Sequence, residues 1–132
     1  MTNRVLIIDD DPLIRSIYKT ALESKYTIKE AQDAIQGMES IISFKPDCVL
    51  LDNMMPGQTG FTMLNEMRKK LLDRPTVIFI SGAMTEELRK NALVLGAILC
   101  FDKSAINTAT LFHAVECALA AKAAMEHNKA TA

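Results

Sequence analysis

Five short segments of the chain alternate with longer segments in which apolar residues recur every three or four positions. Four of the short segments are continuously apolar, which is typical of strands buried on both faces of a parallel sheet. These four are Val5–Ile8, Cys48–Leu51, Val77–Ile80 and Ala97–Phe101. The fifth, Tyr26–Glu30, is partly polar, so we expect it at an edge of the sheet.

The longer segments have the spacing of amphipathic helices. Their apolar residues fall into five groups, from Ile14 to Leu22, Met38 to Ile42, Phe61 to Leu71, Leu88 to Leu95 and Leu111 to Leu119. Pro12 follows Asp11 as a proline at the first helical position follows an N-cap residue, and Gly96 follows the fourth helix. Strict alternation predicts an α/β fold, a five-stranded parallel sheet with five helices on its two faces.

Length and composition limit the class of protein. The chain has 132 residues, of which 49% are apolar and 23% are charged, with 15 basic and 16 acidic residues. This is enough for one domain with its own core, and the balanced charge gives no electrostatic reason to expect nucleic acid. Cys48, Cys100 and Cys117 are odd in number and lie among apolar residues. They predict free, buried thiols instead of disulfides or a zinc site.

Targeting and membrane-spanning segments are not expected. The apolar run that begins at Val5 stops at Ile8, short of the roughly 7 to 15 residues of a signal-peptide core. No run approaches the ~18 apolar residues that cross a bilayer, so we expect a cytoplasmic protein without a membrane partner. The small and polar residues from Met125 to Ala132 predict a short flexible tail after a domain at residues 1–124.

Polar residues stand where the strands are predicted to end. They are Asp9, Asp10 and Asp11 after the first strand, Asp52 after the third, Ser81 after the fourth and Lys103 near the end of the fifth. In an open parallel sheet, ligands bind at the carboxyl ends of the strands. We therefore expect these carboxylates, the hydroxyl and the ammonium group to converge on one edge of the molecule.

Each of these residues also has a structural interpretation. Asp11 suits an N-cap, Asp9 and Asp10 suit a turn favoured by the helix dipole, and Ser81 and Lys103 suit a turn and a solvated charge. Their joint occurrence at the strand ends favours a functional site. Carboxylates close together, without His or Cys, favour Mg²⁺.

An Mg²⁺ ion, an ammonium group and a hydroxyl beside an aspartate are suited to holding a phosphoryl group. A carboxylate can itself attack phosphorus and form an acyl phosphate. Asp52 is the candidate nucleophile, with Lys103 and the cation offsetting the charge of the phosphoryl oxygens.

Four motifs carry a resemblance to a known family. They are VLIIDDDP (Val5 to Pro12), PDCVLLDNMMPGQTG (Pro46 to Gly60), VIFISGA (Val77 to Ala83) and GAILCFDK (Gly96 to Lys103). With their spacing, they resemble the receiver domain of two-component response regulators, over about Arg4 to Ala124. The resemblance implies a doubly wound, flavodoxin-like sheet of strand order 2-1-3-4-5. A chain of this length is then expected to act as a single-domain regulator.

The resemblance implies an Mg²⁺ site formed by Asp9, Asp10, Asp52 and the backbone carbonyl of Met54. It also implies that Asp52 accepts a phosphoryl group from the phosphohistidine of a histidine kinase or a histidine phosphotransfer protein. No other enzymatic reaction is expected beyond self-phosphorylation from phosphodonors and self-dephosphorylation.

The resemblance gives the remaining residues roles in binding and switching. Ser81 would bond one phosphoryl oxygen and Lys103 would pair with another. Phosphorylation would shift the population of the surface formed by the fourth helix, fifth strand and fifth helix, to which a downstream target protein binds.

The sequence departs from the family pattern after and before the motif lysine. Ser104 stands where most receivers have a proline, often with a cis bond, and we expect a trans bond because a non-proline cis bond costs about 2.5 to 4 kcal/mol. Cys100 occupies the aromatic switch position, with Phe101 beside it. We hypothesise altered coupling between Ser81 and the partner surface.

The side chains of Met54 and Ala83 occupy the positions that flank the phosphoryl site in the family. Neither can orient an attacking water by a hydrogen bond. We therefore hypothesise slow self-dephosphorylation.

Two alternatives remain at the level of sequence. A haloacid-dehalogenase-type phosphatase would use Asp9, Asp11 and Leu13 as its first motif, but only Glu116 and Glu126 remain after the motif lysine to supply its further acidic pair. The second alternative is a degenerate receiver that acts as a phosphorylation-independent interaction module. The intact set of site residues, which includes Ser81 and Lys103 besides the three aspartates, argues against it, whereas Cys100 and Ser104 leave it open.

Overall fold

The computed structural model of the protein describes residues 3–71 and 73–131, with side chains as far as residue 127. Its five strands form one parallel sheet in the order β2-β1-β3-β4-β5, which confirms the predicted fold and strand order. The strands are β1 (Arg4–Ile8), β2 (Thr27–Ala31), β3 (Cys48–Asp52), β4 (Thr76–Ser81) and β5 (Ala97–Asp102). The partly polar β2 lies at an edge of the sheet, as predicted.

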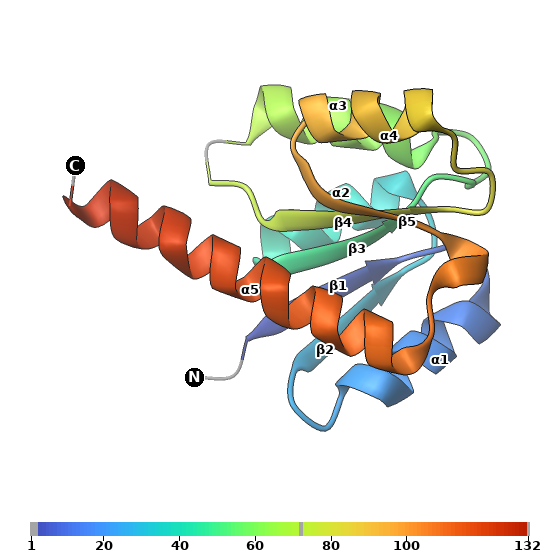
Figure 1. Cartoon of the computed structure of the whole chain (residues 1–132), viewed down its shortest axis with the longest axis horizontal. Helices are drawn as coiled ribbons and strands as arrows, with labels where there is room; N and C mark the ends of the chain where they lie inside the picture. The colour runs from blue at the N-terminus through green and yellow to red at the C-terminus, as the bar shows by residue number, and fades with distance from the viewer. Residues whose placement is uncertain (1–2, 72, 132) are drawn as a thin grey trace.

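Helices cover both faces of the sheet (Figure 1). They are α1 (Pro12–Leu22), α2 (Ala34–Phe44), α3 (Gly60–Lys70), α4 (Glu86–Val94) and α5 (Thr108–Thr131). Helices α1 and α5 pack on one face, and α2, α3 and α4 pack on the other. The predicted N-cap at α1 is confirmed, since the Asp11 side chain accepts a hydrogen bond from the amide of Leu13.

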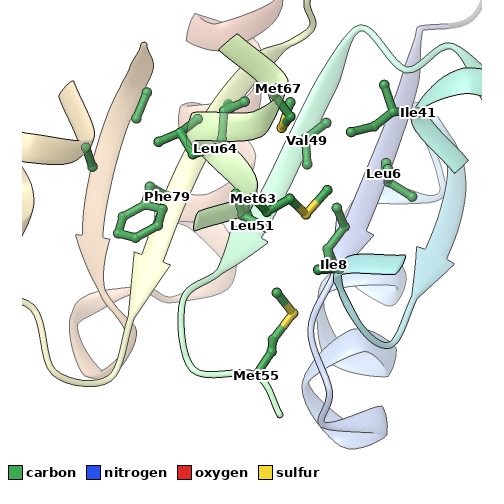
Figure 2. Close-up of a cluster of buried hydrophobic side chains, with 14 of the residues drawn as sticks. Leu6, Ile8, Ile41, Val49, Leu51, Met55, Met63, Leu64, Met67 and Phe79 are labelled. Carbon is green, nitrogen blue, oxygen red and sulfur yellow. The ribbon is translucent and has the colours of Figure 1, made fainter. Parts of the chain in front are cut away.

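The three central strands, β1, β3 and β4, divide their side chains between two cores. Alternate residues point to opposite faces because the side-chain period of a strand is two. Leu6, Val49 and Phe79 face the core under α2, α3 and α4, where Met63 and Met67 also pack (Figure 2). Their neighbours along each strand face the core under α1 and α5.

Some local expectations were wrong. Cys48 and Cys100 are buried, but Cys117 is exposed on the outer side of α5. Strand β5 was predicted to be buried on both faces, but as the second edge strand it pairs only with β4 and leaves Phe101 half-buried.

Most of the tail predicted from Met125 onward is helical instead. Helix α5 continues to Thr131, because this segment is rich in residues that favour helix and carries an ion pair between Lys122 and Glu126 at helical spacing. In the described part of the chain, no helix is long and apolar enough to cross a membrane.

Candidate functional site

The carboxyl edge of the sheet brings the candidate residues together through strand pairing. Ile8 of β1 lies opposite Leu51 of β3, so the residues that follow them, Asp9 and Asp52, are neighbours at this edge. Both aspartates are only 2% exposed. Lys103 directly follows β5 and reaches the same place.

Three carboxylates form a cluster at this edge. One oxygen of each of Asp9, Asp10 and Asp52 lies within 4.8 Å of the others, and Asp10 is the exposed member. Hydrogen bonds hold the loop that carries Asp9, and the amide of Asp9 itself donates to the carbonyl of Ala31 (3.1 Å). The amide of Asp11 donates to Oδ1 of Asp9 (2.9 Å), and Nη1 of Arg15 donates to its backbone carbonyl (2.7 Å).

The ammonium group of Lys103 lies between two buried carboxylates. Its Nζ is 2.9 Å from Oδ2 of Asp9 and 3.4 Å from Oδ1 of Asp52. Burial opposes the charged form of Lys103, but the hydrogen bond to Asp9 and the charges of both aspartates outweigh it and raise the pKa of the amine. Lys103 is therefore held as a cation at neutral pH.

Asp52 carries the least satisfied carboxylate of this edge. Neither of its buried oxygens has a hydrogen-bond partner within the described residues. Desolvation, and then the charge of Asp9, raise the pKa of Asp52 to about 6, with Lys103 acting in the opposite direction. The carboxyl edge thus carries an excess of buried negative charge over its single contacting ammonium group.

This arrangement fits a hard divalent cation. The donors are oxygens only, two of them lack partners, and the exposed Asp10 leaves an open side for water ligands. Mg²⁺ prefers such oxygen donors and needs few of them from the protein, because it keeps several waters. Asp9, Asp10 and Asp52 are the residues that could hold it.

Ser81 ends β4 and is fully buried. Its Oγ accepts a hydrogen bond from the amide of Ala83 (3.1 Å). This bond spans the turn after β4, so the structural interpretation of Ser81 as a turn residue is confirmed. Since the oxygen acts as an acceptor here, its own proton is left to donate elsewhere.

Met54 and Ala83 both expose their side chains beside this edge, and 57% of Met54 is accessible. Met54 lies in the loop that joins β3 to α3. Two hydrogen-bonding residues in the site's surroundings were missed by the sequence reasoning, namely Arg15 and Asn53. Arg15 lies one helical turn after the N-cap of α1, and Asn53 directly follows Asp52. Neither position indicates from the sequence which group the side chain contacts.

The structure shows the local contacts of Ser104 and Cys100, the residues near Lys103 that depart from the family pattern. No cis peptide bond occurs among the described residues, so the bond between Lys103 and Ser104 is trans as predicted. The amide and hydroxyl of Ser104 both donate to Oδ1 of Asp102 and start a short 3₁₀ turn. Cys100 is buried under α4, whereas Phe101 packs on the opposite face of the sheet.

Comparison with known proteins places this geometry in a family. A family model described as "Response regulator receiver domain" matches residues 5–116. A protein-glutamate methylesterase/protein-glutamine glutaminase 2 of Shewanella oneidensis is 36% identical over 104 residues, 74% of this chain and 29% of that protein. A DNA-binding dual master transcriptional regulator of Synechocystis is 39% identical over 67 residues, 50% of this chain and 28% of that protein. The chain thus spans less than a third of either relative.

Solved structures agree. A CheY-like response regulator receiver domain protein from Methanospirillum hungatei superposes with a TM-score of 0.87 at 25% identity, over 95% of this chain and 99% of that one. A receiver domain of a Francisella response regulator gives 0.82, also at 25% identity, over 89% and 97%.

Proposed function

The chain belongs to the response regulator receiver domain family of two-component signalling, and we propose that it accepts a phosphoryl group on Asp52 from a phosphohistidine. The donor is a histidine kinase or a histidine phosphotransfer protein. The observation that carries this proposal is the buried carboxylate of Asp52, which lies beside Asp9 and has the ammonium group of Lys103 as its ion-pair partner.

In this proposal Mg²⁺ is held by Asp9, Asp10, Asp52 and the backbone carbonyl of Met54. When bound, the ion offsets the negative charge of the phosphoryl oxygens and of the carboxylate cluster. A cation held there would oppose the effects that raise the pKa of Asp52 to about 6 and would favour the carboxylate form of Asp52.

The transfer itself is an in-line displacement. An oxygen of Asp52 forms a bond to phosphorus while the bond between phosphorus and the donor imidazole breaks, and its electron pair stays on the imidazole nitrogen. In the phosphorylated protein, the ammonium group of Lys103 pairs with a phosphoryl oxygen. The hydroxyl of Ser81, whose oxygen already accepts from the amide of Ala83, donates its proton to another.

The output in this proposal is protein binding, with a downstream target at the surface formed by α4, β5 and α5. The phosphoryl group favours one of two conformations of this surface by its additional contacts. Burial of Cys100 under α4, with Phe101 on the other face, supports our hypothesis of altered coupling. The exposed, non-hydrogen-bonding side chains of Met54 and Ala83 support slow self-dephosphorylation.

The phosphatase interpretation lacks a supporting observation. In a phosphatase of the haloacid-dehalogenase type, Asp11 would take part in catalysis, but here its side chain caps α1. The activities named for the longer relatives belong to those proteins, and we propose for this chain only the receiver reaction, in the cytoplasm.

The proposal is tested by incorporation of labelled phosphate from acetyl phosphate. We expect stoichiometric incorporation that requires Mg²⁺, and none in Asp52→Asn. Asp73→Asn is the matched control, because Asp73 is an exposed carboxylate near the amino ends of the strands, on the side of the sheet opposite to Asp52. No incorporation by the wild type with Mg²⁺ present would identify a phosphorylation-independent interaction module.

A further inference from the structure

The loop between β3 and α3 is held by one residue, Asn53, which directly follows the acceptor Asp52. Its amide donates to the carbonyl of Ile80 on the neighbouring strand (2.9 Å). Its carbonyl accepts from the amides of Met55 (3.2 Å) and Gly60 (3.1 Å). Asn53 therefore uses both of its backbone groups to fix the start of the loop.

The side chain of Asn53 adds a contact of longer range. Its Oδ1 accepts a hydrogen bond from the amide of Phe61, eight residues away in the first turn of α3 (2.9 Å). This bond closes the loop of residues 53–61 into a ring. Met54, whose carbonyl is the remaining candidate ligand for Mg²⁺, lies inside that ring, between Asn53 and the hydrogen-bonded Met55.

The fit of α3 against this loop is close. A Cβ atom placed on Gly60 would overlap the carbonyl oxygen of Asp52 and lie 2.9 Å from Cα of Asn53. The start of α3 is therefore packed against the backbone of the acceptor itself. This contact and the side chain of Asn53 connect the first turn of α3 to Asp52 and to the loop that carries Met54.

We propose that Asn53 is a positioning residue that holds the carbonyl of Met54 in place for the divalent cation by tying its loop to the first turn of α3. The inference rests on the proposed function, because it assigns a task within the same site. It differs from ordinary helix capping. The cap of α3 is Thr59, whose Oγ1 accepts from the amide of Thr62, so this bond stays within residues 59–62 and does not span the loop to Asn53.

This difference supplies a matched pair of variants. Asn53→Ala and Thr59→Ala each remove one side-chain acceptor from an amide of the first turn of α3. Only Asn53→Ala removes a side-chain bond that spans the loop around Met54, and it leaves the backbone bonds from the Asn53 carbonyl to Met55 and Gly60 in place. We expect Asn53→Ala to weaken Mg²⁺ binding by up to about five- to tenfold, because binding must then order the part of the loop that one lost hydrogen bond had held in place. Thr59→Ala should bind Mg²⁺ like the wild type. The measurement is calorimetric titration of the phosphate-free protein with MgCl₂.

Amide hydrogen exchange gives a second readout that does not need the metal. The amide of Phe61 should lose protection in Asn53→Ala and keep it in Asn53→Asp, which retains an acceptor at this position. Asn53→Asp should also bind Mg²⁺ at least as tightly as the wild type. This variant tests the inference if the alanine variant does not fold.

Equal Mg²⁺ affinities of Asn53→Ala and Thr59→Ala would overturn the inference, as would full protection of the Phe61 amide in Asn53→Ala. If the wild type itself binds no Mg²⁺, the proposed function fails, and this outcome is seen before any variant is compared.

Discussion

The two ends of the sheet each hold a largely buried lysine among acidic groups, and the two lysines are satisfied in opposite ways. At the amino end, Lys122 of α5 contacts Oδ1 of Asp73 (2.8 Å), the carbonyl of Arg74 (2.9 Å) and Glu126 (3.5 Å). The two acidic side chains are 75% and 55% exposed. At the carboxyl end, the carboxylates beside Lys103 are only 3% and 2% exposed.

The two ends differ in which charged group is desolvated, the lysine or the carboxylates. At the amino end the cation is buried and has three acceptors, while the carboxylates keep their hydration. This arrangement completes a structural contact between α5 and the segment before β4. At the carboxyl end the carboxylates are buried and exceed the available cation, so acceptors are left over. An excess of desolvated charge destabilises the fold unless something binds there, which is the property expected of a functional site.

The largest effect should separate the two lysines by phosphoryl transfer. Lys103→Met is expected to slow labelling from acetyl phosphate about 100-fold, because it removes a charge that offsets the phosphoryl oxygens. Lys122→Met should label at the wild-type rate. Equal rates in the two variants would break the comparison, and unfolding curves of both should confirm that each is folded.

Backbone packing at the carboxyl end gives the next largest effect. Gly60→Ala is expected to lower the free energy of unfolding by about 2 kcal/mol, because its Cβ overlaps the carbonyl of Asp52. Gly82→Ala is the control at the same edge, since a Cβ there meets nothing within 4 Å. Urea unfolding measures both, and similar values for the two variants would contradict the close packing of α3 against the acceptor.

The free energy of unfolding should depend on Lys122, the lysine near the amino ends of the strands. Lys122→Met keeps the aliphatic stem but loses the hydrogen bonds of the ammonium group, so we expect the free energy of unfolding to fall by about 1 to 2 kcal/mol. This loss should be the same with and without Mg²⁺. A loss that appears only with Mg²⁺ would link the two ends of the sheet, against the comparison.

A pH dependence of stability should also arise at the carboxyl end. The pKa of Asp52 is raised in the folded protein to about 6, above its unfolded value, so the native state binds the proton more tightly. In chelator, the free energy of unfolding should therefore fall as pH rises from about 4 to about 6, by up to about 3 kcal/mol at about 1.36 kcal/mol per pKa unit, and level off above. The difference between wild type and Asp52→Asn isolates this component, and a difference that is constant with pH would contradict it.

The sequence predicted the fold and the main residues of the candidate site because both follow from short-range patterns. Continuous apolar runs that alternate with helical segments predict a parallel sheet. Because parallel strands end on the same side of the sheet, this pattern alone predicts that Asp9, Asp52 and Lys103 lie close together. The roles of Arg15 and Asn53 were not predictable in this way. Their hydrogen bonds join loops to helices, and nothing in residue spacing specifies which amide or carbonyl a polar side chain reaches.

The exposure of Cys117 was missed for a different reason. Helix α5 is rich in alanine, so its apolar pattern does not distinguish clearly between the face on the sheet and the face in water. The thiol was expected to be buried, but the rotation of the helix, fixed by the contacts of Leu111 and Val115 with the sheet, turns it outward.

The division of each central strand between two cores has a consequence for mutational change. Substitutions on one face of the sheet are coupled to their own helices and largely independent of the other face, since additivity holds between separated sites. A deletion of one residue within β3 would exchange its two sets of side chains and displace Asp52 from the edge. Sequence drift is thus free to remodel either helical layer for a different partner, provided that the count of residues in the strands stays the same.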